Sequence, residues 1–338
     1  MGVLLLLASL TQRIKVGPLS RHLYSTSARR MSGYTLALHG GAGPLQIDRM
    51  SDAKRKECEV ALNRACQAGE KAMELKQSAL DVATATAMAL EEEPLFNAGR
   101  GAVLDDSGRI EMEASLMDGQ TLNAGACTAI TQTRNPILLA RRILEHSPHI
   151  LLYGEGAESF ARKQGLEQME VSWFYTEKRV AHWRATAESG APSLDHASGQ
   201  QEKAQGTIGC VVRDPDGNLA AANSSGGMNR KWRGRVGDSC MIGPGTYADN
   251  RTAAIAGTGT GDYFIRGTTC YDVHSRMMYG KENLEDACQN SLNHLLEIGG
   301  EGGLIAIDKH GDIATPFVSG GMFRLVRKPD GTIETAIF

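Results

Sequence analysis

The hydrophobic positions of the chain fall into short continuous runs and longer stretches with helical spacing. Ser78 and Asp81 stand three residues apart ahead of an apolar stretch, which is the capping-box pattern of a helix start. Asn135 and Pro136 open a further helix as a cap followed by a first-turn proline. The patterns predict strands at residues 34–39, 101–104, 109–116 and 124–131, and helices at 51–76, 82–92 and 137–145.

The composition changes abruptly at residues 186–206, which contain almost no large apolar side chain. We predict a solvated, mobile linker there. A strand pattern begins directly after it, at Thr207, and such a linker is unusual inside one domain unless the chain is cut at that point. The rest of the chain predicts strands at 207–213, 218–222, 303–308, 313–317 and 322–327, and helices at 263–279 and 284–296.

Composition and charge narrow the classes of function. Of 338 residues, 41% are hydrophobic and 22% are charged, so the chain can form a core. A net charge of −3 argues against a nucleic-acid-binding protein. No apolar run reaches the roughly 18 residues that a membrane span needs. The seven cysteines include no C-x-x-C pair and no zinc-ligand spacing, so we expect reduced, buried thiols.

The first 30 residues form a separate segment, because five cations but no acidic residue precede Asp48. Such an Arg- and Ser-containing segment resembles a mitochondrial presequence. Arg21-His-Leu23 followed by Thr26 resembles the pattern of a two-step presequence cleavage, whose final cut would follow Arg30. We therefore predict a targeting presequence at residues 1–30 and a mitochondrial location.

Two other interpretations of this segment remain open. Residues 3–10 form a short apolar stretch of the secretory-signal kind, although no cation precedes it. Alternatively, translation that starts at Met31 would leave a cytoplasmic protein. In every case the fold begins near Tyr34.

A cut between Gly206 and Thr207 would give Thr207 the groups of a catalytic nucleophile. The new N-terminal threonine would carry a hydroxyl nucleophile and an α-amine, whose pKa of about 7.7–8.0 makes it a base near neutral pH. The β-methyl group restricts χ1 and helps to hold the hydroxyl in one direction. Glycine gives the scissile bond conformational freedom. By itself, however, a Gly-Thr pair is more simply a threonine that starts a strand.

Glycine-rich motifs on both sides of this boundary favour a cut before Thr207 over a threonine that merely starts a strand. They are His39-Gly-Gly-Ala-Gly43, Phe96-Asn-Ala-Gly99, Gly206-Thr-Ile-Gly209, Asn223-Ser-Ser-Gly-Gly227, Gly234-Arg-Val-Gly-Asp-Ser239, Gly245-Thr-Tyr-Ala-Asp-Asn250 and Gly257-Thr-Gly-Thr-Gly-Asp262. In this order they closely resemble the plant-type asparaginase and isoaspartyl peptidase family of N-terminal nucleophile hydrolases. The resemblance covers nearly the whole chain from about Tyr34. Each motif alone is unspecific, whereas the series is highly specific.

This resemblance implies an α+β fold, a four-layer αββα sandwich. It also implies self-cleavage before Thr207, which would divide one domain into an α chain of residues 31–206 and a β chain of residues 207–338. Two such heterodimers would pair. Similar enzymes hydrolyse L-asparagine to L-aspartate and ammonia, and cleave β-aspartyl (isoaspartyl) dipeptides. They act on small molecules, without nucleic acid, membrane, catalytic metal or organic cofactor, and residues 90–100 resemble a loop whose carbonyl groups hold a structural sodium ion.

The same resemblance assigns the catalytic residues. Thr207 matches the nucleophile, which forms an acyl-enzyme and uses its own amine as the base. Ser225 matches a position where the family usually has a second threonine, so the methyl group is missing and the rate of self-cleavage is open. The Thr258 hydroxyl and the Gly259 N–H match the donors to the oxyanion.

Arg235 and Asp238 match a clamp on the substrate. The guanidinium would bind the α-carboxylate and the carboxylate would bind the α-ammonium, whereas a structural salt bridge between the two is the alternative. His39 is expected to be structural, because the α-amine already supplies the base. The resemblance implies a substrate-binding set of Asn97, Arg235, Val236, Gly237, Asp238, Thr258, Gly259, Thr260 and Gly261, with cleavage between Gly206 and Thr207.

Three rival functions stay open at this point. Lysosomal glycosylasparaginases would have Asp in place of Gly206, together with a signal peptide and disulfides. Taspase-type proteases also have Asp there and recognise longer peptides, which a clamp on a free amino acid disfavours. The third rival is an uncleaved homologue that binds without catalysis, and Ser225 alone favours it.

Overall fold

Two β-sheets lie face to face in the computed structural model, which describes residues 33–45, 50–187 and 206–338. The larger sheet has the order β12-β11-β1-β5-β6-β2-β3-β4, with β1 at Thr35–Gly43, β2 at Met112–Asp118, β3 at Ala124–Ile130, β4 at Leu151–Tyr153, β5 at Ile208–Arg213, β6 at Leu219–Ser225, β11 at Gly321–Arg327 and β12 at Ile333–Ala336. The smaller sheet has the order β10-β9-β8-β7, with β7 at Thr246–Ala248, β8 at Ala253–Gly259, β9 at Gly302–Asp308 and β10 at Ile313–Ala314.

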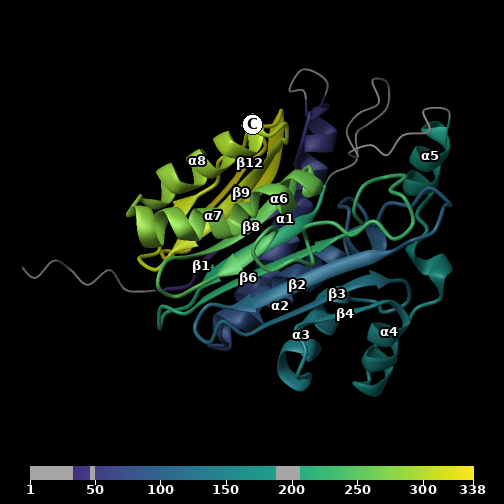
Figure 1. Cartoon of the computed structure of the whole chain (residues 1–338), viewed down its shortest axis with the longest axis horizontal. Coiled ribbons are helices and arrows are strands. Elements are labelled where there is room, and N and C mark those ends of the chain that lie inside the picture. The colour runs from purple at the N-terminus through teal and green to yellow at the C-terminus, as the bar shows by residue number, and fades with distance from the viewer. Residues whose placement is uncertain (1–32, 46–49, 188–205) are drawn as a thin grey trace, which may run out of the picture. The chain divides into compact units, whose positions relative to one another are not determined.

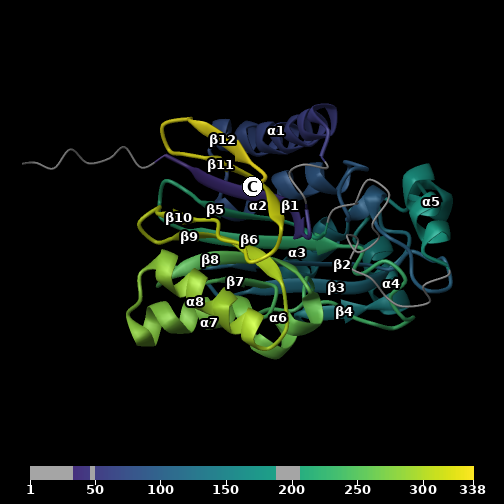
Figure 2. The ribbon, with the colours of Figure 1, turned by 90° about the horizontal axis from the view of Figure 1, so that it is seen from above.

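Helices cover the outer face of each sheet. The larger sheet packs against α1 (Asp52–Glu74), α2 (Ala79–Glu91) and α3 (Pro136–His146), and the smaller sheet packs against α7 (Thr269–Ser275) and α8 (Leu284–Glu297). Figures 1 and 2 show these helix layers on opposite sides of the two sheets. The predicted α+β fold with four αββα layers is confirmed. The other α-helices are α4 (Gly154–Lys163), α5 (Glu177–Ala185) and α6 (Gly261–Gly267).

The central strands of the larger sheet are buried on both faces, which explains their continuous apolar runs. In β1, Leu36 and Leu38 pack with the helices, whereas Ala37 between them packs against the smaller sheet. In β5, Val212 faces the helices and Val211 faces the smaller sheet. The period of two along each strand therefore builds two separate hydrophobic layers, one on each side of the larger sheet.

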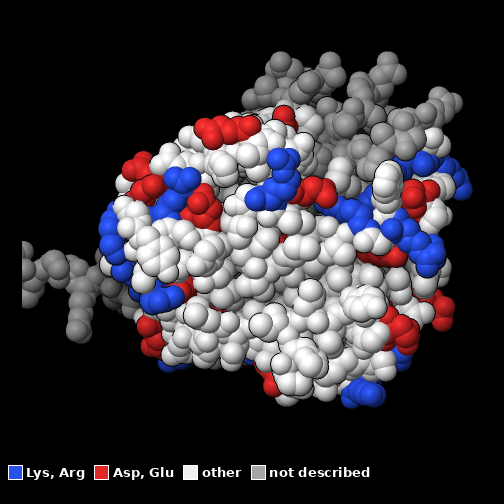
Figure 3. All heavy atoms as spheres, in the orientation of Figure 1, with Lys and Arg blue, Asp and Glu red and all other residues white. Residues whose placement is uncertain are grey.

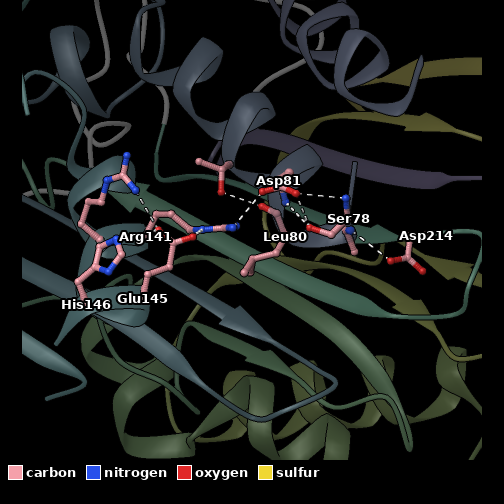
Figure 4. Close-up of polar contacts among 10 residues, drawn as sticks. Ser78, Leu80, Asp81, Arg141, Glu145, His146 and Asp214 are labelled. Carbon is pink, nitrogen blue, oxygen red and sulfur yellow. Dashed lines mark hydrogen bonds and ion pairs between the residues drawn. The ribbon is translucent and has the colours of Figure 1, made fainter. Parts of the chain in front are cut away.

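Polar contacts at the start of α2 join segments that are distant in the sequence. The predicted capping box is present, because Ser78 Oγ accepts from the Asp81 N–H and Asp81 Oδ2 accepts from the Ser78 N–H, each at 3.2 Å. Asp81 also pairs with Arg141 of α3 at 2.9 Å, and Asp214 accepts from the Ala79 N–H at 3.3 Å (Figure 4). Such a cap stabilises a helix by about 1 kcal/mol, and here it also connects α2 to the segment that follows Thr207.

The larger sheet mixes strands from both sides of Gly206. β1 lies between β11 and β5, and β2 lies between β6 and β3. A cut at Gly206 would leave these ladders intact, which supports the prediction that both chains form one domain. The presequence predicted at residues 1–30, and residues 188–205 of the predicted linker, lie outside the described residues.

Several strand boundaries differ from those predicted, for example at β1 and at residues 101–104. β1 continues through Gly43 instead of ending before Gly40, because its glycines pair with β11 beyond an irregularity that follows His39. The strand predicted at 101–104 is reduced to a single bridge between Leu104 and Ile110. The partner strand therefore extends β1, whereas a 3₁₀ turn at Gly99–Gly101 takes up the start of the strand predicted at 101–104.

The helix predicted at 263–279 was too long. Thr268 adopts a left-handed conformation with φ of 49°, which separates α6 from α7, and a π-helical turn follows at Arg276–Gly280. The elements not predicted are mostly short or weakly patterned: β4, β7, β8, β12, α4 and α5.

The surface carries charges of both signs. On the face shown in Figure 3, Lys and Arg alternate with Asp and Glu around an uncharged centre. None of the helices within residues 33–45, 50–187 and 206–338 is long and apolar enough to cross a membrane. The seven cysteines are all buried, as predicted.

Candidate active site

Thr207 lies at the start of β5, beside the end of β6. Ile208 pairs with Ser224 in this antiparallel ladder, which brings Thr207 and Ser225 to the same end of the sheet. Thr207 Oγ1 lies 3.0 Å from Ser225 Oγ and 3.2 Å from Ser239 Oγ. The predicted nucleophile is thus held in a buried cluster of three hydroxyl groups.

A pocket opens at Thr207 and collects most of the predicted site residues. In the part of the chain that the structure describes, four predicted site residues do not line it: Val236, Gly237, Thr258 and Thr260. The Thr260 N–H instead donates to the Glu301 carbonyl group at 2.8 Å. The pocket is lined by Ala42, Asn97, Glu113, Gly206, Thr207, Ser225, Gly227, Met228, Arg235, Asp238, Gly259 and Gly261.

Thr258 on β8 reaches Thr207 from the smaller sheet. Its hydroxyl donates to the Thr207 carbonyl oxygen at 3.5 Å and accepts from the Ala42 N–H at 3.2 Å. Gly259 follows with φ of +149°, and a Cβ there would lie 2.2 Å from the Glu301 carbonyl oxygen, so only glycine fits. The register of β8 therefore places both predicted oxyanion donors next to the nucleophile.

The glycine turn at the end of β1 packs directly on the peptide bond that we predict to be cut. Gly41 has φ of +112°, and a Cβ there would lie 2.4 Å from the Gly206 nitrogen and 2.8 Å from its oxygen. Both the backbone conformation and this close approach require glycine. The turn thus supports the Gly206 peptide from the side of β1.

Arg235 and Asp238 lie on the loop between β6 and β7. Arg235 Nη2 forms an ion pair with Asp262 at 2.9 Å, whereas none between Arg235 and Asp238 occurs among the described residues. Within the same residues, Arg235 Nε and Asp238 Oδ2 are buried and have no hydrogen-bond partner. Buried polar atoms without partners cost free energy, so this pair is suited to a polar ligand rather than to a structural salt bridge.

The electrostatic environment of Asp238 is unusual. Burial raises the pKa of Asp238 to about 7, the Glu113 carboxylate adds to this effect, and Arg235 opposes it. A Cβ at Gly261 would lie 2.4 Å from Asp238 Oδ1 and 2.9 Å from Arg235 Nη2. Glycine at this position therefore keeps the space beside the two charged groups open.

Two buried charged residues at the site were missed by the sequence analysis. Glu113 on β2 pairs in register with Ser225, and its Oε2 accepts from the Gly237 N–H at 2.9 Å. Lys231 Nζ donates to the Gly226 carbonyl oxygen at 2.8 Å, and burial lowers the pKa of Lys231. The available signal for Glu113 was a charged residue between the apolar residues Met112 and Ala114 of the predicted strand.

Comparison with known proteins agrees with this geometry. Residues 32–337 match the model of the asparaginase family. The chain belongs to this asparaginase family. An isoaspartyl peptidase of Salmonella typhimurium is 43% identical over 311 residues, which cover 91% of this chain and 99% of the relative. "Probable isoaspartyl peptidase/L-asparaginase 2" of Arabidopsis thaliana is 39% identical, covering 91% and 100%, and the isoaspartyl peptidase/L-asparaginase of Mus musculus is 39% identical, covering 85% and 86%.

In this asparaginase-family site, the Asn97 side chain forms hydrogen bonds with the backbone near the nucleophile. Its Nδ2 donates to the Gly227 carbonyl oxygen at 2.7 Å, and its Oδ1 accepts from the Val103 N–H at 2.9 Å. The Gly227 N–H in turn donates to Ser225 Oγ at 2.9 Å. Asn97 therefore positions the turn that holds Ser225.

His39 is completely buried in this asparaginase-family chain. Burial lowers the pKa of His39 to about 3, against the opposing effects of the Thr207 backbone and Asn223. The imidazole is therefore neutral at pH 7. This environment agrees with the structural role expected for His39 and not with a general base.

Proposed function

We propose that this asparaginase-family enzyme hydrolyses L-asparagine to L-aspartate and ammonia, and cleaves β-aspartyl dipeptides, through an acyl-enzyme on Thr207. The observation that carries the proposal is the Thr207 hydroxyl, 3.0 Å from Ser225 Oγ, in one pocket with Arg235 and Asp238. The relatives above are named as isoaspartyl peptidases and isoaspartyl peptidase/L-asparaginases, which fits both substrates.

The first reaction acts on the chain itself. Thr207 Oγ1 attacks the Gly206 carbonyl carbon, an ester bond to Oγ1 forms, and the peptide bond to the Thr207 nitrogen breaks. The hydroxyl proton passes to the departing nitrogen. Water then hydrolyses the ester, which leaves a Gly206 carboxylate and a free Thr207 α-amine. Since Gly206 lines the pocket of the uncut chain, its departure also clears space beside the nucleophile.

Turnover uses the new α-amine as the base. The amine takes the Thr207 hydroxyl proton while Oγ1 attacks the side-chain amide carbon of the substrate. The Thr258 hydroxyl and the Gly259 N–H stabilise the resulting oxyanion, and one such donor contributes about 10²–10³ in rate. The leaving nitrogen is protonated and departs as ammonia or as the amine of the peptide. Water then releases aspartate from the ester.

Arg235 and Asp238 select the substrate in this proposal. A guanidinium suits the free α-carboxylate, and the Asp238 carboxylate suits the free α-ammonium. An asparagine residue inside a protein has neither group free and is excluded. Asp262 forms an ion pair with Arg235 Nη2 at 2.9 Å, which helps to set the direction of the guanidinium before the substrate binds.

An assay with three substrates tests this function. L-asparagine should release ammonia and β-aspartyl-leucine should release leucine, because both present a free α-ammonium and α-carboxylate. Nα-acetyl-asparagine should resist hydrolysis, because acetylation removes the positive charge that Asp238 binds. Protein that is cut before Thr207 yet hydrolyses neither of the first two substrates would contradict the proposal.

The raised pKa of Asp238 predicts that ligand binding weakens at acidic pH. The carboxyl group is charged above its pKa of about 7 and becomes protonated below it, so it loses its attraction for the α-ammonium. We expect the inhibition constant of L-aspartate to rise about tenfold for each pH unit below 7. Inhibition kinetics between pH 5.5 and 8 measure this effect, and Asp238→Asn should remove it. A constant inhibition constant across this range would count against the role of Asp238.

A binding protein without catalysis is the second candidate, because Ser225 lacks the methyl group of the threonine usual in the family. The contact of 3.0 Å between Thr207 Oγ1 and Ser225 Oγ forms without that methyl group. The hydroxyl interaction at the nucleophile is therefore retained, and we favour the enzyme.

A structural sodium ion is part of the proposal. Backbone oxygens of the 90–100 loop lie close to glycines in and next to it, because a Cβ at Gly99 would lie 2.4 Å from the Glu91 oxygen and one at Gly101 would lie 2.0 Å from the Phe96 oxygen. Neutral carbonyl oxygens suit a hard monovalent cation. Carbonyl groups of this loop would hold the ion and stiffen the segment that presents Asn97.

Removal of sodium should therefore lower the stability of the enzyme. We expect the Tm to fall by a few degrees when sodium chloride is replaced by choline chloride at equal ionic strength, because bound ligands stabilise the folded state by mass action. Differential scanning calorimetry measures the shift. Identical melting curves in the two salts would argue against the sodium site.

Location and assembly complete the proposal. We propose a mitochondrial enzyme, with a cytoplasmic one as the alternative if translation starts at Met31, and a dimer of αβ heterodimers. The acid-free segment before Asp48 supports the first, and the family resemblance supports the second. Imaging of a C-terminal fluorescent fusion tests the location, and light scattering of the cleaved protein tests the assembly. Diffuse cytoplasmic fluorescence or the mass of a single heterodimer would contradict the respective proposal.

A further inference from the structure

The nucleophile has a second hydroxyl neighbour besides Ser225. Ser239 Oγ lies 3.2 Å from Thr207 Oγ1, and Ser239 is completely buried. Ser239 immediately follows Asp238, so one short segment contributes both to the proposed substrate clamp and to the surroundings of the nucleophile. The sequence motif ends at Ser239, but nothing in the motif assigned it a role.

The number of protons on these hydroxyl groups determines which of them donates each hydrogen bond. A hydroxyl group has one proton to donate and two lone pairs that can accept. Thr207 uses its proton toward Ser225 Oγ at 3.0 Å, and Ser225 Oγ also accepts from the Gly227 N–H at 2.9 Å. Thr207 therefore has no proton left for Ser239. The hydrogen bond of 3.2 Å must be donated by Ser239 to Thr207 Oγ1.

The backbone at Ser239 is held from β2. Ser115 Oγ donates to the Ser239 carbonyl oxygen at 2.7 Å and also contacts Thr246 Oγ1 at 2.8 Å. Both Ser115 and Thr246 are completely buried. These contacts connect the Ser239 segment to both sheets, so the backbone that carries the hydroxyl is held in place by the fold.

We propose that Ser239 is a further catalytic residue that donates a hydrogen bond to Thr207 Oγ1 and orients its reactive lone pair. The role rests on the proposed function. During the attack, the Thr207 proton passes to the base, an Oγ1–carbon bond forms, and the carbonyl π electrons move to the oxygen. The Ser239 proton stays on Ser239 throughout. Ser239 thereby provides a second hydrogen bond that positions the nucleophile, in a site where Ser225 lacks the methyl group of threonine.

Ser239→Ala tests this role directly. We expect self-cleavage and kcat for L-asparagine each to fall about tenfold, the effect of one lost hydrogen bond, while KM stays within about twofold. Ser239→Cys, which keeps a similar size and a weak donor, should be intermediate in both rates. Ser291→Ala removes another buried serine hydroxyl, which binds Asp272 instead, and should leave both rates unchanged.

Rates of self-cleavage on gels, steady-state kinetics and Tm give separate readouts. Ser239→Ala with unchanged rates would overturn the role of Ser239 while leaving the proposed function standing. A rise in KM alone would also overturn it, because Ser239 would then act only through Asp238. If Ser239→Ala does not fold, equal rates for Ser239→Cys and the wild type would overturn the role. A wild-type protein that neither cleaves itself nor hydrolyses asparagine would contradict the proposed function as well.

Discussion

Thr207→Ala is expected to abolish both self-cleavage and hydrolysis. The substitution removes the hydroxyl that lies 3.0 Å from Ser225 Oγ and 3.2 Å from Ser239 Oγ, which is the group that forms the ester in the proposed mechanism. Asparaginase activity should fall on the order of 10⁴-fold or more, as is typical when a covalent nucleophile is lost. Gel electrophoresis and an ammonia-release assay measure the two effects. Thr207→Ser, which retains the hydroxyl group, should still cleave itself.

Thr35→Ala is a matched control for this variant. Thr35 is completely buried and lies in β1 opposite Arg213, at the other end of β5. Its hydroxyl has no hydrogen-bond partner among the described residues, so its loss should leave both reactions intact. Hydrolysis of β-aspartyl dipeptide by Thr207→Ala at the wild-type rate would show that another residue is the nucleophile.

Arg235→Ala should slow the hydrolysis of L-asparagine but leave self-cleavage, the maturation step, intact. Loss of a buried cation that binds a carboxylate removes about 2–5 kcal/mol, and we expect kcat/KM for L-asparagine to fall about 10²–10³-fold. Self-cleavage should continue, because Arg235 forms no hydrogen bond or ion pair with Gly206 or Thr207 in the described structure. Steady-state kinetics on the cleaved variant measure the loss.

Arg162→Ala is the control for Arg235→Ala, since Arg162 forms an exposed ion pair with Glu155 on α4, away from the pocket. Its kinetics should match those of the wild type. If Arg235→Ala remains an intact single chain, Arg235 also supports maturation. An unchanged kcat/KM would remove Arg235 from the substrate clamp.

The fold was predictable where local chemistry decides it. The capping box of Ser78 and Asp81 needs only neighbouring residues, and α2 begins as expected. The predicted end of β1 was wrong because Gly41 and Gly43 pair with a strand from the far end of the sequence. Likewise, Thr268 adopts the left-handed conformation that divides α6 from α7, whereas glycine is the usual residue in that conformation and Gly267 precedes it.

The site was predictable only in part. Its motifs marked Thr207, Ser225 and Asp238, and the structure places all three in one pocket. Glu113 and Ser239 could not be assigned a role from the sequence, because the β2–β6 register and the packing of the loop before β7 bring them to the nucleophile. Their positions depend on contacts between segments that are distant along the chain.

The intact mass of freshly purified protein, measured again after incubation, tests the central claim most directly. We expect two chains, of which the smaller begins at Thr207 and ends at Phe338, with a mass of about 14 kDa in proportion to 36.3 kDa for 338 residues. Edman sequencing of that chain should give threonine first. A single chain that stays uncut, or a cut at any other residue, would contradict the assignment of Thr207 as an N-terminal nucleophile.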